Sequence, residues 1–363
     1  MKILYLGYFS KLNIDERFCS LAANNVCSYV KTTLCKKYDG DVVIINLAQG
    51  KKHFSFCKSN KSTNGNVTII DAPRYGSGRL LSRFSNLMLR KWVRKFIKRN
   101  LEDNDQILIY HSLNTLKLER YIARKYNSVL QVEEIYCDVV AKSRKTKRIE
   151  LESINSFSKH LFVSKSLMND SRIKSLNSTI FYGSYSLPEV PNVNRLNKSI
   201  VYAGTFEKNK GVDFACDLME ILPDYTLYVY GHGSASRKEE LLSKYGKKKN
   251  IVFCDQLRDE DLSQKLFQYQ YGISPLDPNS AFNSTTFPSK ILTYLKSGLM
   301  VVSSRFNSVI DSPFNEYVIM ADYNFESYKK AIVEHTACVF DSRNFIKSLD
   351  DKFGHELIDL IKL

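Results

Sequence analysis

The segment SIVYAGTFEKNKGVDFACDLMEIL (residues 199–222) contains glycines and a lysine in an order that suits phosphate binding. An apolar run ends at Gly204, and Lys210 and Gly211 come directly before a stretch with helical spacing of apolar residues. The first N–H groups of a helix have no intrahelical partner, so with a lysine beside them they can bind an anion. The segment therefore predicts a phosphate site where a strand leads into a helix.

A second strand-like run, YTLYVYGHG (residues 225–233), ends with Gly231 and Gly233 on either side of His232. A dinucleotide-binding fingerprint needs a third glycine and an acidic residue at the end of the following strand. Neither is present at the required distance, so the run does not predict a site for NAD.

The segment NSTTFPSKILTYLKSGLMVVSS (residues 283–304) reads as a loop, a helix and a buried strand. Pro288 suits the first turn of a helix, where its missing N–H costs nothing, and Thr286 is a candidate cap. Gly298 is expected to end this helix. Thr285 and Thr293 stand eight positions apart, one before the helix and one within it.

Strand-like and helix-like segments alternate along the whole chain, which predicts parallel sheets covered by helices on both faces. The chain has 363 residues, which favours two domains. The prolines and polar residues of positions 186–198 predict a linker between an N-terminal domain (1–185) and a C-terminal domain (199–342). A last helix, at about 343–363, is expected to pack back on the first domain.

The composition is that of a soluble globular protein, with 44% hydrophobic residues, 25% charged residues and a net charge of +15. The eight cysteines form no C-x-x-C pair and lie at no metal-ligand spacing from a histidine. We therefore expect reduced thiols, no metal site and a cytoplasmic protein. The positive charge favours an anionic partner, but no nucleic-acid-binding module is recognisable, so nucleic acid is not expected.

Five segments in order, YAGTFEKNKG, VYGHG, VFCDQL, ISPL and FPSKILTYLKSGLMVVSS, resemble the C-terminal half of family-four retaining glycosyltransferases over about residues 199–321. In the first half QILIYHS, VLQVEEIY and HLFVSKSL match that family more loosely. The resemblance implies an α/β protein of the GT-B fold, with two Rossmann-like domains whose parallel sheets face each other across a cleft.

Bacterial members of this family build O-antigen, capsule and exopolysaccharide. The resemblance thus implies transfer of a hexose from a nucleotide-diphosphate sugar, with a UDP-sugar as the first candidate, to a polyprenyl-linked oligosaccharide. The reaction would retain the anomeric configuration, and it would need neither a metal nor a cofactor. The enzyme would work in the cytoplasm, on the inner face of the plasma membrane.

Carried over position by position, the resemblance assigns Lys210 to the donor phosphates and makes it a catalytic candidate. The arginine that the family places shortly before this lysine is absent, because Thr205 and Phe206 stand there. Lys290 is expected to compensate in part. The other implied donor-site residues are Gly204, Gly231, Gln256, Leu257, Thr285, Phe287, Ser289 and Thr293, with His232 as a further candidate donor contact.

Thr285 and Thr293 fall at the family's two glutamate positions, as counted back from Gly298. A threonine hydroxyl can make one hydrogen bond to a ribose but not the charged, bidentate contact of a carboxylate. The alternative interpretation is therefore a catalytically inactive glycosyltransferase-like subunit that binds a glycan or a partner.

In the first half, His111 lies near the end of the run QILIYHS. The resemblance implies that a histidine here contacts the donor sugar or acts at the reaction centre, which makes His111 a catalytic candidate. The alternative is a strand-end histidine whose hydrogen bonds are satisfied within the protein. Glu133 and Glu134 follow VLQV, at a strand end where α/β sheets place ligands, and are candidate acceptor-binding residues. Neighbouring residues on a strand point in opposite directions, so at most one of the two is expected to face a ligand.

The stretch RLLSRFSNLMLRKWVRKFIKR (residues 79–99) carries apolar side chains at helical spacing and no acidic residue. A basic amphipathic helix with Trp and Phe is typical of an element that contacts an anionic membrane, here the inner membrane. The predicted membrane-contact residues are Arg83, Arg90, Lys91, Trp92, Arg94 and Lys95. The alternative is an ordinary crossover helix with a solvated basic face.

Overall fold

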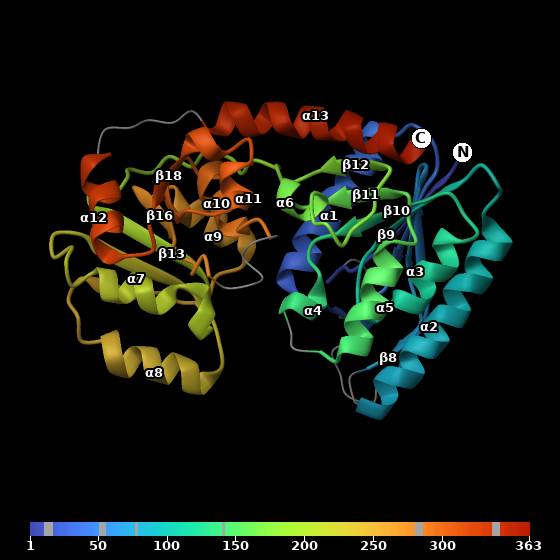
Figure 1. The fold of residues 1–363 in the computed structure, drawn as a ribbon, viewed down its shortest axis with the longest axis horizontal. Coiled ribbons are helices and arrows are strands. Elements are labelled where there is room, and N and C mark those ends of the chain that lie inside the picture. Colours follow the sequence, from blue (N-terminus) through green and yellow to red (C-terminus); the bar gives the residue numbers. More distant parts are fainter. Residues whose placement is uncertain (11–16, 51–55, 77–78, 140–141, 280–285, 336–341) are drawn as a thin grey trace. The chain divides into compact units, whose positions relative to one another are not determined.

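The computed structural model describes residues 1–10, 17–50, 56–76, 79–139, 142–279, 286–335 and 342–363. The chain divides into two α/β units, each with its own sheet (Figure 1). Unit 1 comprises residues 1–163, 167–184 and 351–363, and unit 2 comprises residues 164–166 and 185–350. Each unit is described below by itself.

Unit 1 is built on an eight-stranded sheet with the strand order β12-β11-β10-β9-β1-β3-β7-β6. β6 pairs antiparallel with β7, and the other neighbours pair in parallel. The strands of this sheet are β1 (Ile3–Gly7), β3 (Val42–Asn46), β6 (Asn60–Asn64), β7 (Val67–Asp71), β9 (Gln106–Tyr110), β10 (Ser128–Val132), β11 (Lys159–Phe162) and β12 (Asn177–Ile180). The described residues also form two short antiparallel pairs, β2 (Arg17–Phe18) with β4 (Gln49–Gly50) and β5 (Phe56–Cys57) with β8 (Arg74–Tyr75).

The helices of unit 1 are α1 (Leu21–Lys37), α2 (Arg79–Asn100), α3 (Leu116–Ala123), α4 (Tyr136–Val139) and α5 (Arg144–Ile154). Right-handed crossovers place α1 on one face of the sheet and α2, α3 and α5 on the other, because the strand order runs in opposite directions from β1 (Figure 1). The guanidinium of Arg94, on α2, lies 4.3 Å from the ring centre of Tyr121, on α3, and so joins two helices of this layer.

Unit 2 has a six-stranded parallel sheet with the order β15-β14-β13-β16-β17-β18. Its strands are β13 (Ser199–Thr205), β14 (Thr226–His232), β15 (Ile251–Phe253), β16 (Tyr271–Ser274), β17 (Met300–Ser304) and β18 (Val318–Ala321). Its helices are α7 (Val212–Leu218), α8 (Ala235–Tyr245), α9 (Asp259–Leu266), α10 (Ser289–Lys296), α11 (Asn307–Ile310) and α12 (Phe325–Glu334), with 3₁₀ turns at Lys208–Lys210 and Asn315–Tyr317.

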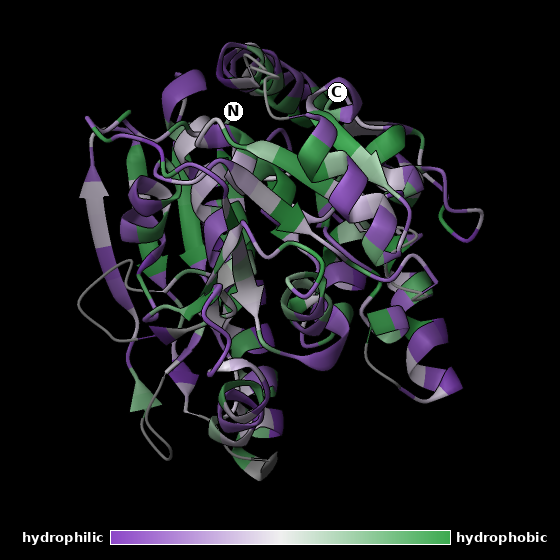
Figure 2. Cartoon of the chain, turned by 90° about the vertical axis from the view of Figure 1, so that its left-hand side faces the viewer, coloured by the Kyte–Doolittle hydropathy of each residue, from purple (hydrophilic) through white to green (hydrophobic). Residues whose placement is uncertain are grey.

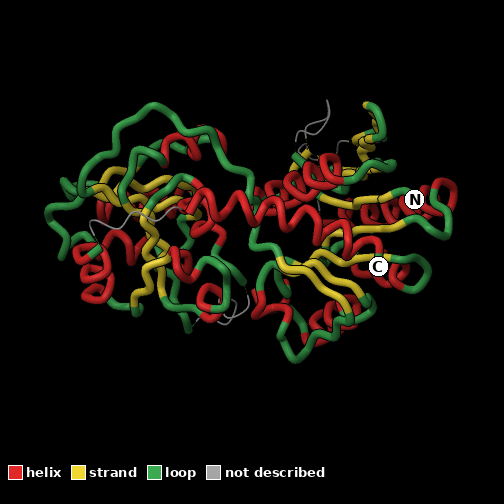
Figure 3. The backbone as a smooth tube through the Cα atoms, turned by 90° about the horizontal axis from the view of Figure 1, so that it is seen from above, coloured by secondary structure: helices red, strands yellow, loops and turns green. Residues whose placement is uncertain are grey.

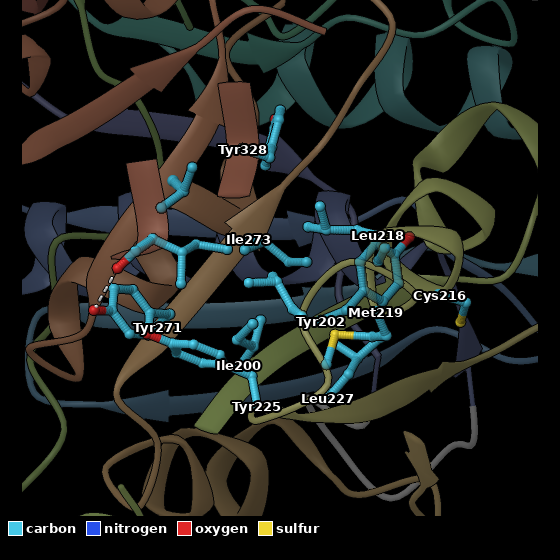
Figure 4. Close-up of a cluster of buried hydrophobic side chains, with 14 of the residues drawn as sticks. Ile200, Tyr202, Cys216, Leu218, Met219, Tyr225, Leu227, Tyr271, Ile273 and Tyr328 are labelled. Atoms are coloured by element: carbon cyan, nitrogen blue, oxygen red, sulfur yellow. Dashed lines mark hydrogen bonds between the residues drawn. The ribbon is translucent and has the colours of Figure 1, made fainter. Parts of the chain in front are cut away.

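Helices cover both faces of the unit 2 sheet, as the tube in Figure 3 shows. The order of the strands places α7 and α8 on one face and α9, α10 and α11 on the other. α12 returns to the α7 face, where the ring of Phe214 packs against Phe325 and Tyr328. Figure 4 shows part of the core on that face, with Tyr202 and Ile200 of β13 among side chains of α7, β14 and β16.

Two helices have residues in both units: α6 (Lys165–Met168) and the last helix, α13 (Ser342–Lys362). In unit 1, Phe353 of α13 packs against Tyr29 and Phe181, with ring centres 5.7 and 5.0 Å away. The end of the chain therefore contributes to the core of the unit in which the chain begins.

The predicted alternation of strands and helices is confirmed, and hydrophobic residues are frequent in the strands (Figure 2). One strand was not foreseen, and one local expectation was wrong. β6, with the sequence NKSTN, was not foreseen, because a polar edge strand lacks the apolar signal of a buried one. Pro288, and not Thr286, occupies the N-cap of α10, and the helix itself begins at Ser289. Gly298 follows the end of α10 with φ of 68°, as expected.

Candidate functional site

The carboxyl end of β13 is the point in unit 2 where the direction of the strand order reverses. The chain leaves β13 towards β14 on one side, and it later returns to β16 on the other side. Open α/β sheets bind ligands at the carboxyl end of such a switch point, in the gap between the diverging crossovers. Gly204 and Thr205 end β13 here, so the predicted phosphate segment lies at the place that the topology favours.

Lys290, in the first turn of α10, reaches this strand end. Its Nζ lies 3.8 Å from the ring centre of Tyr202 and donates a hydrogen bond of 3.0 Å to the carbonyl oxygen of Lys210. A Cβ atom on Gly204 would overlap Cε and Nζ of Lys290. The lysine side chain thus passes directly over the backbone of Gly204, and a side chain at position 204 would require this lysine to move.

The carbonyl of Lys210 joins the elements of this site. It accepts from Lys290 Nζ and also from the hydroxyl of Tyr202, at 2.7 Å. The same hydroxyl lies 2.9 Å from the carbonyl oxygen of Thr205. Through this carbonyl the loop between β13 and α7 is fixed against the strand, and the Lys290 amine is held beside residue 210.

Two further glycines let backbone segments meet at this end of the sheet. A Cβ on Gly231, which pairs with Gly204 across the sheet, would overlap the Gly204 carbonyl oxygen. Gly211 is the N-cap of α7 with φ of 88°, and a side chain there would meet the carbonyl of Pro275. Glycine at position 231 lets the ends of β13 and β14 approach each other, and glycine at position 211 lets the start of α7 approach the chain after β16.

Burial and, to a smaller extent, the nearby Lys210 ammonium together lower the pKa of Lys290 to about 7. The charge of Lys210 disfavours protonation of the nearby Lys290 amine, because two like charges repel each other. An anionic group bound beside them would stabilise the charged form of Lys290. The arrangement can therefore bind a phosphate and neutralise charge that develops on it.

The other predicted donor residues are arranged around the same edge of the sheet. Ser289 is exposed at the start of α10, and Phe287 is buried with its ring 5.5 Å from that of Phe314. Gln256 is exposed and Leu257 half-buried, in the loop after β15. Exposed His232 is the last residue of β14. Thr285 lies outside the described residues.

Thr293 is half-buried on α10, and its hydroxyl donates to the carbonyl oxygen of Ser289 at 3.2 Å. Its proton is thereby used within the helix. Only a lone pair of this oxygen remains for a ligand, which is less than a carboxylate at this position would offer.

Arg237 was not singled out from the sequence. From the first turn of α8, its Nε donates to the carbonyl oxygen of Phe206 at 2.7 Å, and its NH2 group pairs with Asp213 of α7. It therefore holds the loop between β13 and α7 from the second side. Neither this residue nor Tyr202 carries a sequence signal, because the loop carbonyls that accept their hydrogen bonds are brought near only by the tertiary fold.

In unit 1, His111 follows β9 and is 1% exposed. Its Nδ1 lies 3.0 Å from Glu119 of α3, and its Nε2 lies 3.2 Å from Glu150 of α5. Burial by itself would lower the pKa of His111, but the two carboxylates outweigh burial and raise it to about 9. Both ring nitrogens are engaged, so this geometry favours the structural alternative for His111 over contact with a ligand.

The two carboxylates around His111 are themselves fully hydrogen-bonded. Glu150 also accepts from the backbone N–H groups of Tyr136 and Cys137, at 2.6 and 3.0 Å. Glu119 also accepts from Thr115 and Ser153, both at 2.7 Å. This network anchors the chain immediately after Glu133 and Glu134.

Glu133 and Glu134 lie directly after β10, at the carboxyl edge of the unit 1 sheet, and both are half-buried. Gln131 donates to Glu133 Oε1 at 3.1 Å and accepts from the Tyr5 hydroxyl at 2.9 Å. Burial raises the pKa of Glu133 to about 7, although the Gln131 hydrogen bond opposes the rise. Glu133 can therefore either donate or accept a hydrogen bond near neutral pH.

The predicted membrane-contact residues on α2 differ in their exposure. Arg83, Lys91 and Lys95 are exposed, whereas Arg90, Trp92 and Arg94 are half-buried. Trp92 stacks on Phe96 at 5.6 Å, and Arg94 is engaged with α3, where it also donates to the Lys117 carbonyl oxygen at 3.2 Å. Phe84 (50%) and Leu87 (41%) are the exposed apolar side chains of the described part of this helix.

Residues 197–336 match the family described as glycosyl transferases group 1. Among curated proteins, no sequence match was found. None of the described helices is long and apolar enough to cross a membrane.

Solved structures of similar fold span the whole chain. Sucrose-phosphate synthase from Thermosynechococcus elongatus has a TM-score of 0.73 at 12% identity, covering 99% of this chain and 98% of that one. The trehalose-6-phosphate protein from E. coli, bound with UDP-2-fluoro glucose, has a TM-score of 0.68 at 10% identity, covering 100% and 99%. The pneumococcal O-GlcNAc transferase GtfA, in complex with UDP and GlcNAc, has a TM-score of 0.62 at 11% identity, covering 99% and 97%.

The likeness to these structures confirms the predicted GT-B fold. The family match falls on unit 2, which holds the lysine pair and the glycines described above.

Proposed function

We propose that this chain, a glycosyltransferase of the GT-B fold, transfers a hexose from a nucleotide-diphosphate sugar to a lipid-linked oligosaccharide in bacterial surface polysaccharide synthesis. The observation that carries the proposal is the convergence of Lys210 and Lys290 at the carboxyl end of β13. Solved proteins of the same fold carry UDP or a UDP-sugar analogue, so UDP-sugars are the first candidate donors.

In this reaction the bond between the anomeric carbon and the diphosphate oxygen breaks, and a bond from that carbon to an acceptor oxygen forms. The acceptor hydroxyl loses its proton, which the leaving diphosphate can take. Negative charge grows on the diphosphate in the transition state, so two ammonium groups held there lower the barrier. We expect retention of the anomeric configuration and no requirement for a divalent cation at the lysine pair.

The donor site is tested by measuring the binding of UDP, GDP and their sugar derivatives to the full chain by calorimetry and thermal shift. A ligand that binds the folded state alone raises its stability with the logarithm of saturation. Lys290→Ala is expected to weaken nucleotide binding by about tenfold to a hundredfold, as expected when a charged hydrogen bond is lost.

Lys296→Ala is the matched control, because Lys296 lies on the same helix with its amine outside the lysine pair and near Asp259. Its nucleotide affinity should equal that of the wild type. If Lys290→Ala and the wild type bind every nucleotide with equal affinity, Lys290 does not contribute to a donor site.

The second candidate function is an inactive glycosyltransferase-like subunit that binds a glycan or a partner. The hydroxyl of Thr293 favours it, because it donates within α10 instead of offering a carboxylate. Turnover separates the two candidates: hydrolysis or transfer of any nucleotide sugar, abolished by Lys210→Ala, supports the enzyme. Glycan binding without turnover or nucleotide binding would support the inactive subunit.

For the acceptor side, we propose that unit 1 contacts the cytoplasmic face of an anionic membrane through α2, and that Glu133 or Glu134 binds the acceptor glycan. Exposed Phe84 and Leu87 next to exposed Arg83 and Lys91 combine apolar and basic groups, as interfacial elements do.

Flotation with anionic vesicles at low salt tests this contact. The double variant Phe84→Ser/Leu87→Ser should lose most vesicle binding. The control Leu242→Ser/Val333→Ser, which removes two equally exposed apolar side chains from unit 2, should retain it. If wild-type protein does not float at low salt, the membrane contact is wrong, whereas the donor site is unaffected.

A further inference from the structure

Unit 1 contains a cavity of about 740 Å³ that no step of the proposed reaction uses. Its walls come from α3, from α5 and from the loop after α6. Six basic side chains line it: Arg120, Arg124, Arg144, Lys147, Arg148 and Arg172. Glu152 is the one acidic side chain among the described residues that line it.

Neighbouring acids neutralise only part of this charge. Arg172 pairs with Asp138 and Asp170 at 2.7 and 2.6 Å, and Lys147 also pairs with Asp138. Glu152 is shared by Arg120 and Arg148, at 3.5 and 3.4 Å. Three carboxylates against six cations leave a net charge of +3 around the cavity.

Arg124 and Arg144 are the two lining cations that these three carboxylates do not pair with. Both are exposed, and neither makes an ion pair within the described residues. A guanidinium presents its N–H groups as a planar fork, which matches two oxygens of a phosphoryl group. Arg172, held by two carboxylates, supplies a fixed wall beside them.

The direction of α5 makes the same region more positive. Its first turn contains no acidic residue. The helix begins with Arg144, and Lys147 and Arg148 follow, all three at the cavity. The N-terminal end of a helix carries a partial positive charge, so cations there are unfavourable and anions favourable. An anion in the cavity would relieve both the repulsion among the cations and their conflict with the helix dipole.

We propose that this cavity binds a phosphoryl group, carried either by a soluble sugar phosphate or diphosphate or by the head group of a phospholipid or polyprenyl phosphate. All of its lining residues belong to unit 1, whereas the lysine pair belongs to unit 2. The proposal therefore stands without the proposed donor site.

The test uses pyrophosphate as the probe and the full-length Lys290→Ala protein as the starting chain, so that binding at the lysine pair is weakened. Calorimetry compares this protein with the same protein carrying Arg124→Gln and Arg144→Gln. The matched control instead carries Lys247→Gln and Lys249→Gln, which removes two exposed cations from a turn of unit 2. Circular dichroism confirms that all three proteins are folded.

We expect the arginine substitutions to weaken pyrophosphate binding at least about tenfold, because two charge-assisted contacts are lost, and the lysine substitutions to leave it unchanged. The same affinity in all three proteins, or a tenfold loss with the control substitutions as well, would overturn the proposal. The result does not depend on nucleotide binding, so failure of the donor site and failure of the cavity are distinguishable.

A second arm separates the two sources of the phosphoryl group. Vesicles of phosphatidylcholine with phosphatidic acid are compared with vesicles of phosphatidylcholine alone. Loss of binding to phosphatidic acid in the Arg124→Gln/Arg144→Gln protein assigns the cavity to a lipid head group. Pyrophosphate binding that depends on these arginines, with vesicle binding that does not, assigns it to a soluble ligand. If neither pyrophosphate binding nor vesicle binding depends on Arg124 and Arg144, the proposal is wrong.

Discussion

At the scale of single residues, the amine of Lys290 couples nucleotide binding to pH. Its pKa is lowered to about 7, so a large fraction of this amine is neutral above that pH in the free protein. A bound diphosphate favours the ammonium form and raises its pKa again. Binding above pH 7 therefore requires uptake of a proton.

We predict that UDP affinity falls as the pH rises from 7 to 9, by up to about tenfold per pH unit. Calorimetry in buffers of different ionisation enthalpy should detect the proton uptake directly. Lys290→Arg, whose guanidinium stays charged, should remove most of this dependence. An equally steep dependence in the arginine variant would show that a different group titrates.

The same residue affects stability in the opposite direction. The pKa of Lys290 in the folded protein lies below the ordinary lysine value of 10.5. Between about pH 7 and 10.5 this lysine is mostly protonated in the unfolded chain and mostly neutral in the folded protein. Folding must therefore release a proton, which lowers the free energy of unfolding most near pH 7. Its contribution to stability improves as the pH rises through the window.

How well the site could be predicted differs from residue to residue. Gly204 and Lys210 were predicted because strand, glycine and helix signals are local and lie in a fixed order, and Lys290 was predicted from the family resemblance. Tyr202 and Arg237 were missed, since each acts on a carbonyl of a loop whose position depends on the tertiary fold. His111 was located correctly at a strand end, but its two carboxylate partners lie 8 and 39 positions further along the chain. The roles assigned to the site residues stay predictions.

At the scale of elements, the His111 network joins β9, α3 and α5 inside unit 1. His111 supplies a positive charge between two buried carboxylates. We predict that His111→Phe lowers the free energy of unfolding by about 3–5 kcal/mol, the usual cost of leaving a buried charge without its partner. Urea unfolding at pH 6 measures this loss.

The pH dependence of that loss follows from the raised pKa. The stabilisation is fully present below the ordinary histidine pKa of 6.5 and is lost as the pH rises through about 9. The gap between wild type and variant should therefore shrink between pH 6.5 and 9.

His160 of unit 1 is the matched control for this variant. It is buried and its pKa is lowered to about 4, so it is neutral and bonded to Ser175 and the Ile154 carbonyl. His160→Phe should cost less, about 1–3 kcal/mol, without a similar change with pH. A gap that is constant from pH 6 to 9.5 in the His111 variant would contradict the assigned charge.

The elements themselves were largely predictable. Buried parallel strands appear in the sequence as continuous runs such as VVIIN and QILIY, whereas the hairpin partner β6 is polar and was missed. Alternation of strands and helices gave the fold class, because each crossover must return to a parallel neighbour. The strand order, which defines the switch point at β13, is a tertiary property and needed the structure.

At the scale of the whole molecule, the last helix returns the chain to the unit in which it began. Phe353 is 2% exposed and stacks on Tyr29 and Phe181. We predict that Phe353→Ala lowers the stability of unit 1 by about 3–5 kcal/mol, as loss of a buried aromatic ring usually does. Urea unfolding monitored by hydrogen exchange, which reports each unit separately, measures the effect.

Phe325→Ala serves as the control for that variant, because Phe325 lies on α12 of unit 2 and is 40% exposed. It should change the protection of unit 1 little. If Phe353→Ala leaves the exchange of β9 and β10 amides unchanged, the end of the chain is not part of the unit 1 core.

The glycines at the end of β13 and β14 also restrict how this protein can evolve. At position 231 a side chain would clash with a backbone carbonyl, and no substitution elsewhere can remove a backbone atom. At position 204 it would meet the end of a flexible lysine instead. Over many generations, descendants of this chain should therefore keep Gly231 without exception, whereas Gly204 and Lys290 should change only together. A saturation library selected for folded protein would show this asymmetry as tolerance at 204, restricted to clones with a shorter residue at 290.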